Sequence, residues 1–267
     1  MTGINIFDGG TFVIAFARLL SLLNFYIFYC TQPRYPIMKI RSASALIAAS
    51  LLLGGCITAP QTPIGLAPDT LSAKSGRVGV AMTVLPKVNT SFPGASCLLC
   101  IATAEAANSA LTTHAQTLPY EDLSKLKDEL ADMLRKKGVD VTVISEPIDI
   151  EKLESNDKDG PNIARKNFTP LRSKYTIGKL LLIDITSLGF LRTYSAYFPT
   201  SDPKAYQQGA GSIVNLKNNT YEWYMPVNIN KSADKNWDEP PKFPGLSNAY
   251  FQVLELSKDA YLQPFKD

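Results

Sequence analysis

Residues 179–198 read Lys-Leu-Leu-Leu-Ile-Asp-Ile-Thr-Ser-Leu-Gly-Phe-Leu-Arg-Thr-Tyr-Ser-Ala-Tyr-Phe and carry the strongest strand pattern in the chain. The first half is an almost unbroken run of leucine and isoleucine, which is typical of a strand that is covered on both faces. From Phe190 to Phe198 apolar and polar residues alternate, as they do along a strand with one exposed face. The sequence therefore predicts a central strand over about 179–190.

The segments that follow this strand predict antiparallel neighbours. Pro199 to Pro203 forms a turn, and residues 205–216 and 220–227 then read as a hairpin closed near Asn218-Asn219. The short connections favour antiparallel pairing. Residues 245–264 follow a charged, proline-rich loop and have the apolar spacing of a closing amphipathic helix.

The segments that precede the central strand alternate between strands and helices. We expect strands over 77–85 and 139–144, a buried alanine-rich helix over 98–116, an amphipathic helix over 120–137 and a short helix around 162–167. Helical crossovers join parallel strands. The predicted fold class is α/β (α+β): a single mixed-sheet domain with helices packed on its faces and a C-terminal helix.

A second pattern, upstream of this domain, concerns export. A basic opening, Met38 to Arg41, precedes an apolar run, Ala43 to Leu53, that ends in Leu53-Gly54-Gly55-Cys56. This order is that of a signal peptide. The cysteine after Leu-Gly-Gly resembles the lipobox of bacterial lipoproteins, which implies cleavage before Cys56 and a diacylglyceryl group on its thiol.

With this signal peptide assigned, the chain has four predicted parts. Residues 38–55 are the predicted signal peptide, and 56–75, rich in Thr, Pro and Ala, read as a flexible tether. Residues 76–267 form the predicted globular domain. Residues 1–37 contain another apolar segment, Thr11 to Cys30, but the second signal has its own methionine. We therefore interpret 1–37 as an upstream extension of the gene model, in which Cys30 has no role.

The charge balance of the predicted mature chain excludes two partner classes. The whole chain has 27 basic and 24 acidic side chains. Residues 1–55 hold four of the basic ones and one acidic one, so the remainder has 27 − 4 = 23 against 24 − 1 = 23. This balance argues against nucleic acid as a partner and against a polybasic attachment to anionic lipid.

The mature domain also resembles known envelope proteins. Its order of elements is similar to that of the small α/β domains of the Tol-system translocation protein, the curli-secretion lipoprotein and the lipoprotein activators of penicillin-binding proteins. Residues 93–100 and 197–202 (Tyr-Phe-Pro-Thr-Ser-Asp) resemble segments of uncharacterised proteobacterial lipoproteins. These resemblances imply an envelope location and no particular activity.

Cys97 and Cys100 form a Cys-x-x-Cys motif just before the predicted helix. A redox pair at a helix N-terminus is one interpretation, because the helix dipole lowers a thiol pKa. The Leu-Leu spacer lacks the character of thioredoxin-like motifs, so a local disulfide or two inert thiols are the alternatives. A zinc site would need two more ligands than these cysteines supply, and we predict no metal and no cofactor beyond the lipid on Cys56.

Other chemistry-bearing residues lack the partners that catalysis needs. His114, the only histidine, lies near the end of an alanine-rich segment with no nucleophile motif nearby. Asp184 interrupts the central strand, and a buried carboxylate there would be functionally suggestive. Acid–base catalysis would need a second carboxylate, for which Glu105, Glu222 and Asp202 are candidates. No sequence pattern selects one of them, so no catalytic residue is assigned. Gly209-Ala-Gly211 opens a strand, so it predicts a bulge or bend and not a phosphate loop.

Aromatic residues gather around the predicted hairpin. A partner surface there would use Tyr194, Tyr197, Tyr221, Trp223 and Tyr224, although cross-strand packing explains the same pattern. Residue 57 is Ile, where the inner-membrane retention signal of enterobacterial lipoproteins has Asp; by this resemblance the location is the outer membrane, on its periplasmic face.

Two function hypotheses follow. The first is a non-enzymatic lipoprotein, anchored to the bilayer through acylated Cys56, that contacts an envelope protein or peptidoglycan. The second is a periplasmic thiol-redox factor or enzyme that uses Cys97 and Cys100. The missing catalytic constellation favours the first, and the sequence leaves the oligomeric state open.

Overall fold

A six-stranded mixed sheet is the framework of the computed structural model, which describes residues 60–72, 75–158 and 160–266. The central strand, β4 (Lys179–Leu191), spans the predicted region. β1 (Val78–Met82) and β3 (Val141–Val143) are parallel to it, as expected for strands joined through helices. β7 (Lys204–Asn215) and β8 (Thr220–Ser232) form the predicted antiparallel hairpin, so the order is β3-β1-β4-β7-β8.

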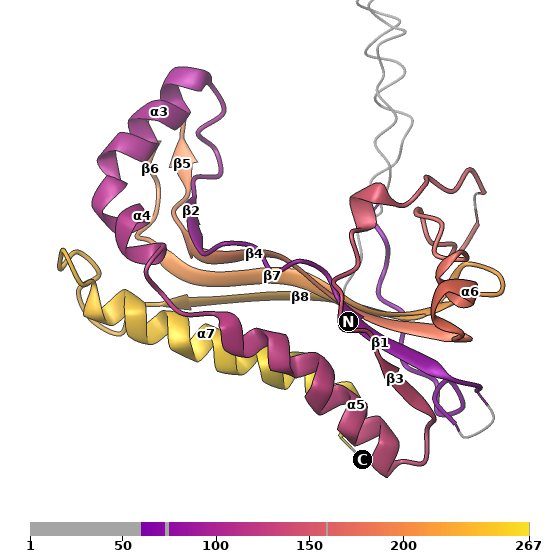
Figure 1. Cartoon of the computed structure of the whole chain (residues 1–267). Coiled ribbons are helices and arrows are strands. Elements are labelled where there is room, and N and C mark those ends of the chain that lie inside the picture. Colours follow the sequence, from indigo (N-terminus) through magenta and orange to yellow (C-terminus); the bar gives the residue numbers. More distant parts are fainter. Residues whose placement is uncertain (1–59, 73–74, 159, 267) are drawn as a thin grey trace, which may run out of the picture. The chain divides into compact units, whose positions relative to one another are not determined.

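The two faces of the sheet are covered differently. α5 (Leu126–Lys136), which follows the 3-10 turn η1 (Glu121–Lys125), and α7 (Pro244–Leu262), followed by η3 (Gln263–Phe265), lie along one face (Figure 1). Their buried side chains make the main core with the inward side chains of β4, Leu181, Ile183 and Ile185. The mixed α/β class and the C-terminal helix were predicted and are confirmed.

The opposite face, which we call the open face, carries two raised parts (Figure 1). One of them, the charged lobe, is residues 150–175, with η2 (Ile150–Lys152) and α6 (Leu171–Tyr175). It packs on a smaller core that includes Leu180, Leu182 and Val214. The predicted helix around 162–167 is wrong: those residues form turns, held by bridges of Ser155 to Lys166 and of Ile163 to Thr220.

The other raised part, the upright lobe, consists of β2 (Asn89–Ser91), α3 (Leu98–Ala107), and the small strands β5 (Tyr194–Ser195) and β6 (Phe198–Pro199). α4 (Ser109–Ala115) leads from it down to the sheet (Figure 1). β2 pairs in parallel with the far end of β4, at Gly189 to Leu191. The single buried helix predicted over 98–116 is wrong in two respects: it divides at Asn108, and most of α3 is exposed.

The start of the described chain is packed on the fold, where the sequence predicted a flexible tether over 56–75. The backbone N–H of Ile64 donates to Tyr224 O at 2.8 Å, and Tyr224 N–H returns a bond of 3.1 Å. Leu66 and Leu71 lie against the main core, and Lys179 Nζ donates to the carbonyl of buried Thr70 at 2.7 Å. Edge strand β8 is thus partly covered by this segment.

Residues 1–59 lie outside the described part of the chain, and with them the predicted signal peptide and Cys56. Within the described residues, no helix has the length and apolar character needed to cross a membrane.

Candidate functional site

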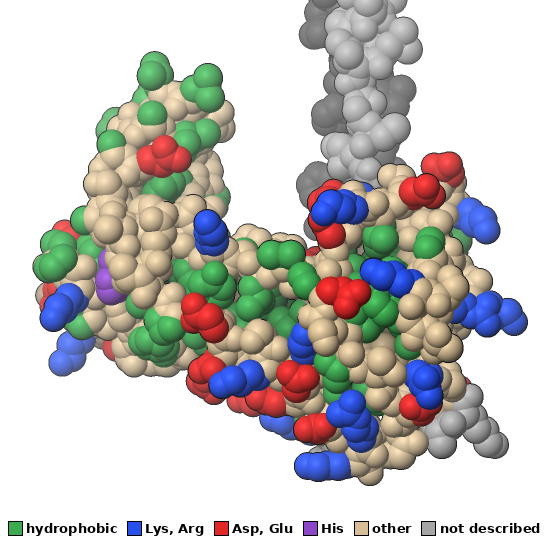
Figure 2. Space-filling model, in the orientation of Figure 1, with side chains coloured by type: hydrophobic (Ala, Val, Ile, Leu, Met, Phe, Trp, Pro, Cys, Tyr) green, Lys and Arg blue, Asp and Glu red, His purple; other side chains and the backbone are tan. Residues whose placement is uncertain are grey.

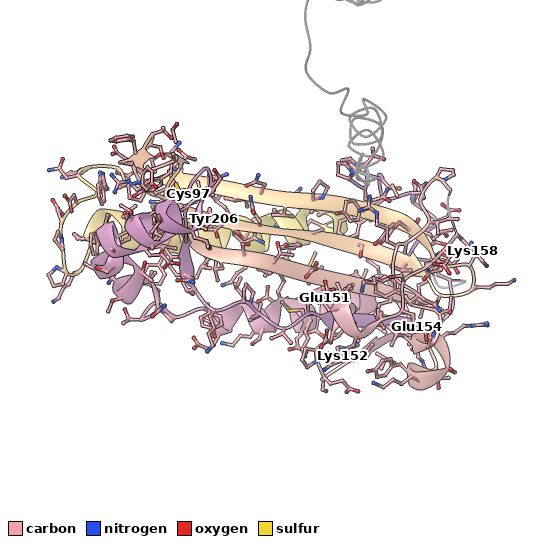
Figure 3. The ribbon with its side chains drawn as sticks, turned by 90° about the horizontal axis from the view of Figure 1, so that it is seen from above. Cys97, Glu151, Lys152, Glu154, Lys158 and Tyr206 are labelled. Carbon is pink, nitrogen blue, oxygen red and sulfur yellow. A yellow bond between two sulfur atoms is a disulfide. The ribbon has the colours of Figure 1, made fainter. Side chains whose placement is uncertain are left out.

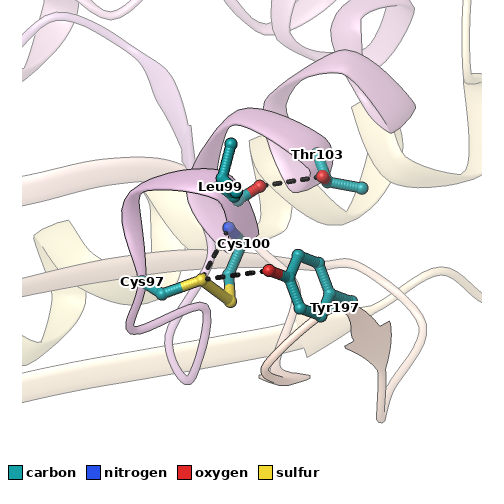
Figure 4. The surroundings of a disulfide bond; sticks show 5 residues. All are labelled: Cys97, Leu99, Cys100, Thr103 and Tyr197. Carbon is teal, nitrogen blue, oxygen red and sulfur yellow. Dashed lines mark hydrogen bonds between the residues drawn. A yellow bond between two sulfur atoms is a disulfide. The ribbon is translucent and has the colours of Figure 1, made fainter.

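The N-terminus of α3 is closed by a disulfide between Cys97 and Cys100 (Figure 4). Cys97 has extended backbone and is the N-cap, and its sulfur accepts the N–H of Cys100 at 3.0 Å. A capping acceptor satisfies one of the unpaired N–H groups of the first helical turn. The Tyr197 hydroxyl lies 3.6 Å from the same sulfur. The disulfide therefore fixes the first turn of α3 and links it to the β5–β6 turn.

The base of the upright lobe is held by a polar network around buried Asn108. Its Nδ2 donates to Tyr194 OH and to Ala104 O, both at 2.7 Å, and its Oδ1 accepts from Arg192 Nη1 at 3.0 Å. Gly94 has φ of +90°, and a Cβ there would lie 1.9 Å from Tyr194 O, so the turn before α3 requires glycine. These contacts place α3 rigidly above the sheet.

The outer surface of this lobe is apolar. Leu98 is 87% exposed, Leu99 70% and Phe198 74%, and Ile101 and Tyr197 are also exposed. We call these five residues the apolar tip. Figure 2 shows apolar side chains at the top of the lobe. In Figure 3 its Cys97 lies near one end of the long strands, whereas Glu151 and Lys152 of the charged lobe lie near their middle and Glu154 and Lys158 toward the other end.

The apolar tip was not predicted as a surface, although the sequence contains a signal for it. Residues 98–107 read Leu-Leu-Cys-Ile-Ala-Thr-Ala-Glu-Ala-Ala, with one charge and apolar residues on every side. A helix that is apolar all round is usually buried in a core or in a membrane. The prediction of a buried helix followed from this rule, and the structure buries only Cys100 and Ala104 of α3, in a small cluster with Ala95 and Tyr194.

The five aromatic residues proposed as a partner surface are not brought together. Trp223 is only 3% exposed and packs against Phe265 on the side of the sheet that α5 and α7 cover. Tyr194 is buried against Phe92 inside the upright lobe, whereas Tyr197 belongs to the apolar tip. Only Tyr221 and Tyr224 remain neighbours, with ring centroids 5.3 Å apart beside the open face.

Asp184 lies on the open face between the two lobes. Thr83 Oγ1 donates to its Oδ1 at 2.9 Å. Two shallow depressions, of about 420 and about 310 Å³, meet at Asp184 and Thr186. Burial raises the pKa of Asp184; the Thr83 hydrogen bond opposes this rise and the charge of Glu151 adds to it.

None of the three acids considered as partners of Asp184 forms a catalytic pair with it. Glu105 lies on α3, Asp202 is exposed beyond β6, and Glu222 is ion-paired with Lys179 at 2.6 Å. Among the described residues there is also no group of three or more His, Cys, Asp or Glu side chains that could hold a metal ion.

His114 Nε2 lies 2.7 Å from Ser247 Oγ, but this pair is not arranged like a nucleophile and its base. The Ser247 hydroxyl, in the first turn of α7, also bonds the carbonyls of Lys242 and Phe243 just before that helix. Burial lowers the pKa of His114, and its ring packs on Phe243. The contact joins α4 to α7.

Gly209 and Gly211 are required by close packing. A Cβ on Gly209 would lie 2.1 Å from Asp184 O, and one on Gly211 would lie 2.5 Å from the Trp223 ring. Both residues lie inside β7, where they allow close approach of their neighbours.

Comparisons with known proteins give structural likenesses only. No family model matches the chain, and no curated protein matches it. Similar solved structures include the PelC dodecamer from Paraburkholderia phytofirmans (11% identity, TM-score 0.30, 78% of this chain and 96% of that one) and protein XCC0632 from Xanthomonas campestris, a DUF330 protein (12%, 0.31, 76% and 93%). A third is lipoprotein GNA1162 from Neisseria meningitidis (11%, 0.25, 67% and 98%).

Proposed function

We propose that this protein is a lipid-anchored, non-enzymatic component of the bacterial envelope that binds its partner through the apolar tip. The single observation that carries the proposal is the exposure of Leu98, Leu99 and Phe198 on a lobe that a disulfide and a buried polar network hold rigid. Clustered exposed apolar side chains mark interaction surfaces in soluble domains.

The lipid anchor is the second part of this proposal and comes from the sequence. The Leu53-Gly54-Gly55-Cys56 motif implies acylation of Cys56 and cleavage before it, and Ile57 favours the outer membrane, on its periplasmic face. A disulfide in the mature domain suits the oxidising periplasm. Partners compatible with this location are another envelope protein, peptidoglycan or the membrane itself.

Incorporation of radiolabelled palmitate tests the anchor. Wild type is expected to take up label and to give a mature chain that starts at Cys56, and Cys56→Ala is expected to take up none. Cys30→Ala is the matched control, because it removes the other cysteine outside the disulfide and should keep full labelling. Label that persists in Cys56→Ala, or a product that retains residues 1–37, would refute the proposal.

A thiol-redox function is the second candidate, favoured by the exposure of Cys97 at a helix N-cap while Cys100 is buried. An exposed first thiol and a protected second one is the arrangement that thiol–disulfide exchange needs. Thiol titration of the folded protein after mild reduction distinguishes the candidates. A thiol that reacts rapidly near pH 6 would support redox chemistry, and thiols that react only at alkaline pH would support a structural disulfide.

A further inference from the structure

The outward surface of α3 is unusual for a helix in water. Besides the apolar tip, its exposed positions are Ala102, Thr103, Glu105, Ala106 and Ala107, so Glu105 is the one charged side chain on the helix. The neighbouring β5–β6 turn adds Tyr197 and Phe198 at the same end of the lobe. Leucine and phenylalanine side chains partition into the acyl-chain region of a bilayer, and tyrosine is enriched at its headgroup boundary.

The apolar tip lies on the open-face side of the sheet. α3 rises from the open face, opposite α5 and α7, and the first described residues, indigo in Figure 1, approach β8 from the same side as α3. Ile64 is held to Tyr224 by two backbone hydrogen bonds.

Chain length then limits how far the proposed anchor lies from that face. Ile64 lies eight positions after Cys56 in the sequence, and a fully extended chain spans at most about 3.4 Å per residue, or about 27 Å in all. A lipid on Cys56 thus keeps the membrane surface within about that distance of the edge of the sheet. An anchor within this reach and a tip at the open face can therefore meet the same bilayer surface.

A second copy of the chain is a poorer match for the tip. The other large exposed apolar side chains in the described residues are Val84 on the loop after β1 and Phe251 and Leu256 on α7, which do not form one complementary patch. A bilayer accepts apolar side chains without a shaped counterpart. The proposed lipid on Cys56 also brings a bilayer close to the domain.

We infer that the apolar tip is a second membrane contact, in which Leu98, Leu99 and Phe198 insert into the same bilayer that holds the lipid of Cys56. This inference rests on the proposed lipid anchor. Tyr197 then lies at headgroup level, and the open face with Asp184 faces the membrane surface across a gap bounded by the two lobes. The protein would lie against the bilayer in one orientation and not swing freely on its anchor.

Fluorescence quenching by lipids that carry bromine on their acyl chains tests the inference. The lipid-modified Leu98→Trp and Leu99→Trp variants are reconstituted into phosphatidylethanolamine–phosphatidylglycerol vesicles that contain the brominated lipid. Leu256→Trp, at an exposed position of α7, is the matched control. Emission of the added tryptophan at 98 or 99 should be quenched severalfold more than emission of the tryptophan at 256. It should also shift to the blue relative to the same variant in solution without vesicles.

Equal quenching of the tip variants and of Leu256→Trp would overturn the inference. So would a blue shift without quenching that grows with protein concentration, because it would mean that copies of the chain cover the tip. Palmitate label on Cys56 is measured in every sample. Labelled protein with an unquenched tip refutes the membrane contact alone, whereas unlabelled protein refutes the proposed function.

Discussion

The side-chain amide of Asn108 donates a 2.7 Å hydrogen bond to the hydroxyl of Tyr194, joining the break between α3 and α4 to strand β5. The two residues are 86 positions apart in the sequence. Asn108 is also the acceptor for Arg192, which precedes β5, so one buried amide organises both halves of the upright lobe. The direction in which the apolar tip points depends on this contact.

Tyr194→Phe is expected to lower the stability of the lobe by about 1 kcal/mol, because it removes a buried hydrogen bond while keeping the ring in place. Amide exchange in α3 should rise, and exchange in α5 and α7 should not change. Tyr197→Phe is the control: its hydroxyl is on the exposed side of the disulfide, and its removal should have little effect. Equal effects of the two variants would contradict the assigned role of Asn108.

Removal of the disulfide is expected to loosen α3 without unfolding the domain. Closing a loop of this length contributes about 2 kcal/mol in the chain-entropy model. Cys97→Ser with Cys100→Ala should therefore increase exchange of the first-turn amides of α3 and lower Tm modestly. Wild type in reductant is the matched sample and should show the same increase in exchange. Unchanged exchange in both samples would show that N-capping by residue 97, and not the disulfide, holds the first turn of α3.

Leu181→Ala is expected to cost about 2–5 kcal/mol, because Leu181 is fully buried between β4 and the helices and the substitution leaves a cavity. Urea denaturation measures the free energy of unfolding. Val84→Ala, at a largely exposed position, should change it by no more than about 0.5 kcal/mol. A loss below about 1 kcal/mol for Leu181→Ala would mean that the helices do not close over the sheet.

The pH dependence of stability should reveal Asp184. Burial raises its pKa in the folded state above the ordinary value of 3.8, so the folded protein binds this proton more tightly than the unfolded chain does. The ionised carboxylate therefore reduces stability at pH values above the folded pKa, and protonation relieves that penalty as the pH falls through it.

Asp184→Asn is accordingly expected to be more stable than wild type at pH 7, with the gain disappearing toward pH 3.8. Parallel thermal unfolding series from pH 3.5 to 7.5 measure the difference. Thr186→Ala, its neighbour on the open face, carries no titrating group and should give a difference independent of pH. A constant difference for Asp184→Asn would show that this carboxyl is solvated.

Much of the fold could be predicted because its elements have regular patterns. The apolar run from Leu180 to Ile185 identified the central strand, and the spacing of apolar residues along α5 and α7 identified the helices that cover it. Short connections after β4 and helical ones before it gave the parallel and antiparallel halves of the sheet.

The sequence offered the Cys97–Cys100 disulfide as one alternative, but the apolar tip could not be predicted, because it depends on departures from those patterns. A register shift between Ile213 and Val214 places Tyr221 and Trp223 on opposite faces, although strict alternation would put them on the same one. The exposure of α3 results from the Asn108 network, which connects residues that no local pattern relates. Ile64 is likewise held by an edge strand 160 residues later in the chain.

Ile64→Pro is expected to free the segment before β1. Proline cannot donate the 2.8 Å hydrogen bond to Tyr224 O. The segment is short and has few other backbone hydrogen bonds to β8, so the loss of this one should release Ile64 from the strand. Limited proteolysis and amide exchange should then show increased access to residues 60–72, whereas Ile64→Ala, which keeps the N–H, should stay protected.

The same variant tests how far orientation depends on this pairing. With Ile64 released, the next hydrogen-bonded attachment is buried Thr70, whose carbonyl Lys179 holds, and the span from Cys56 grows from eight residues to fourteen, or from about 27 to about 48 Å when extended. A longer tether lowers the effective concentration of the tip at the bilayer. Quenching of Leu99→Trp by brominated lipid should therefore fall in the Ile64→Pro background and be retained in Ile64→Ala; equal quenching in both would mean that the tip binds the membrane independently of where the anchor leaves the fold.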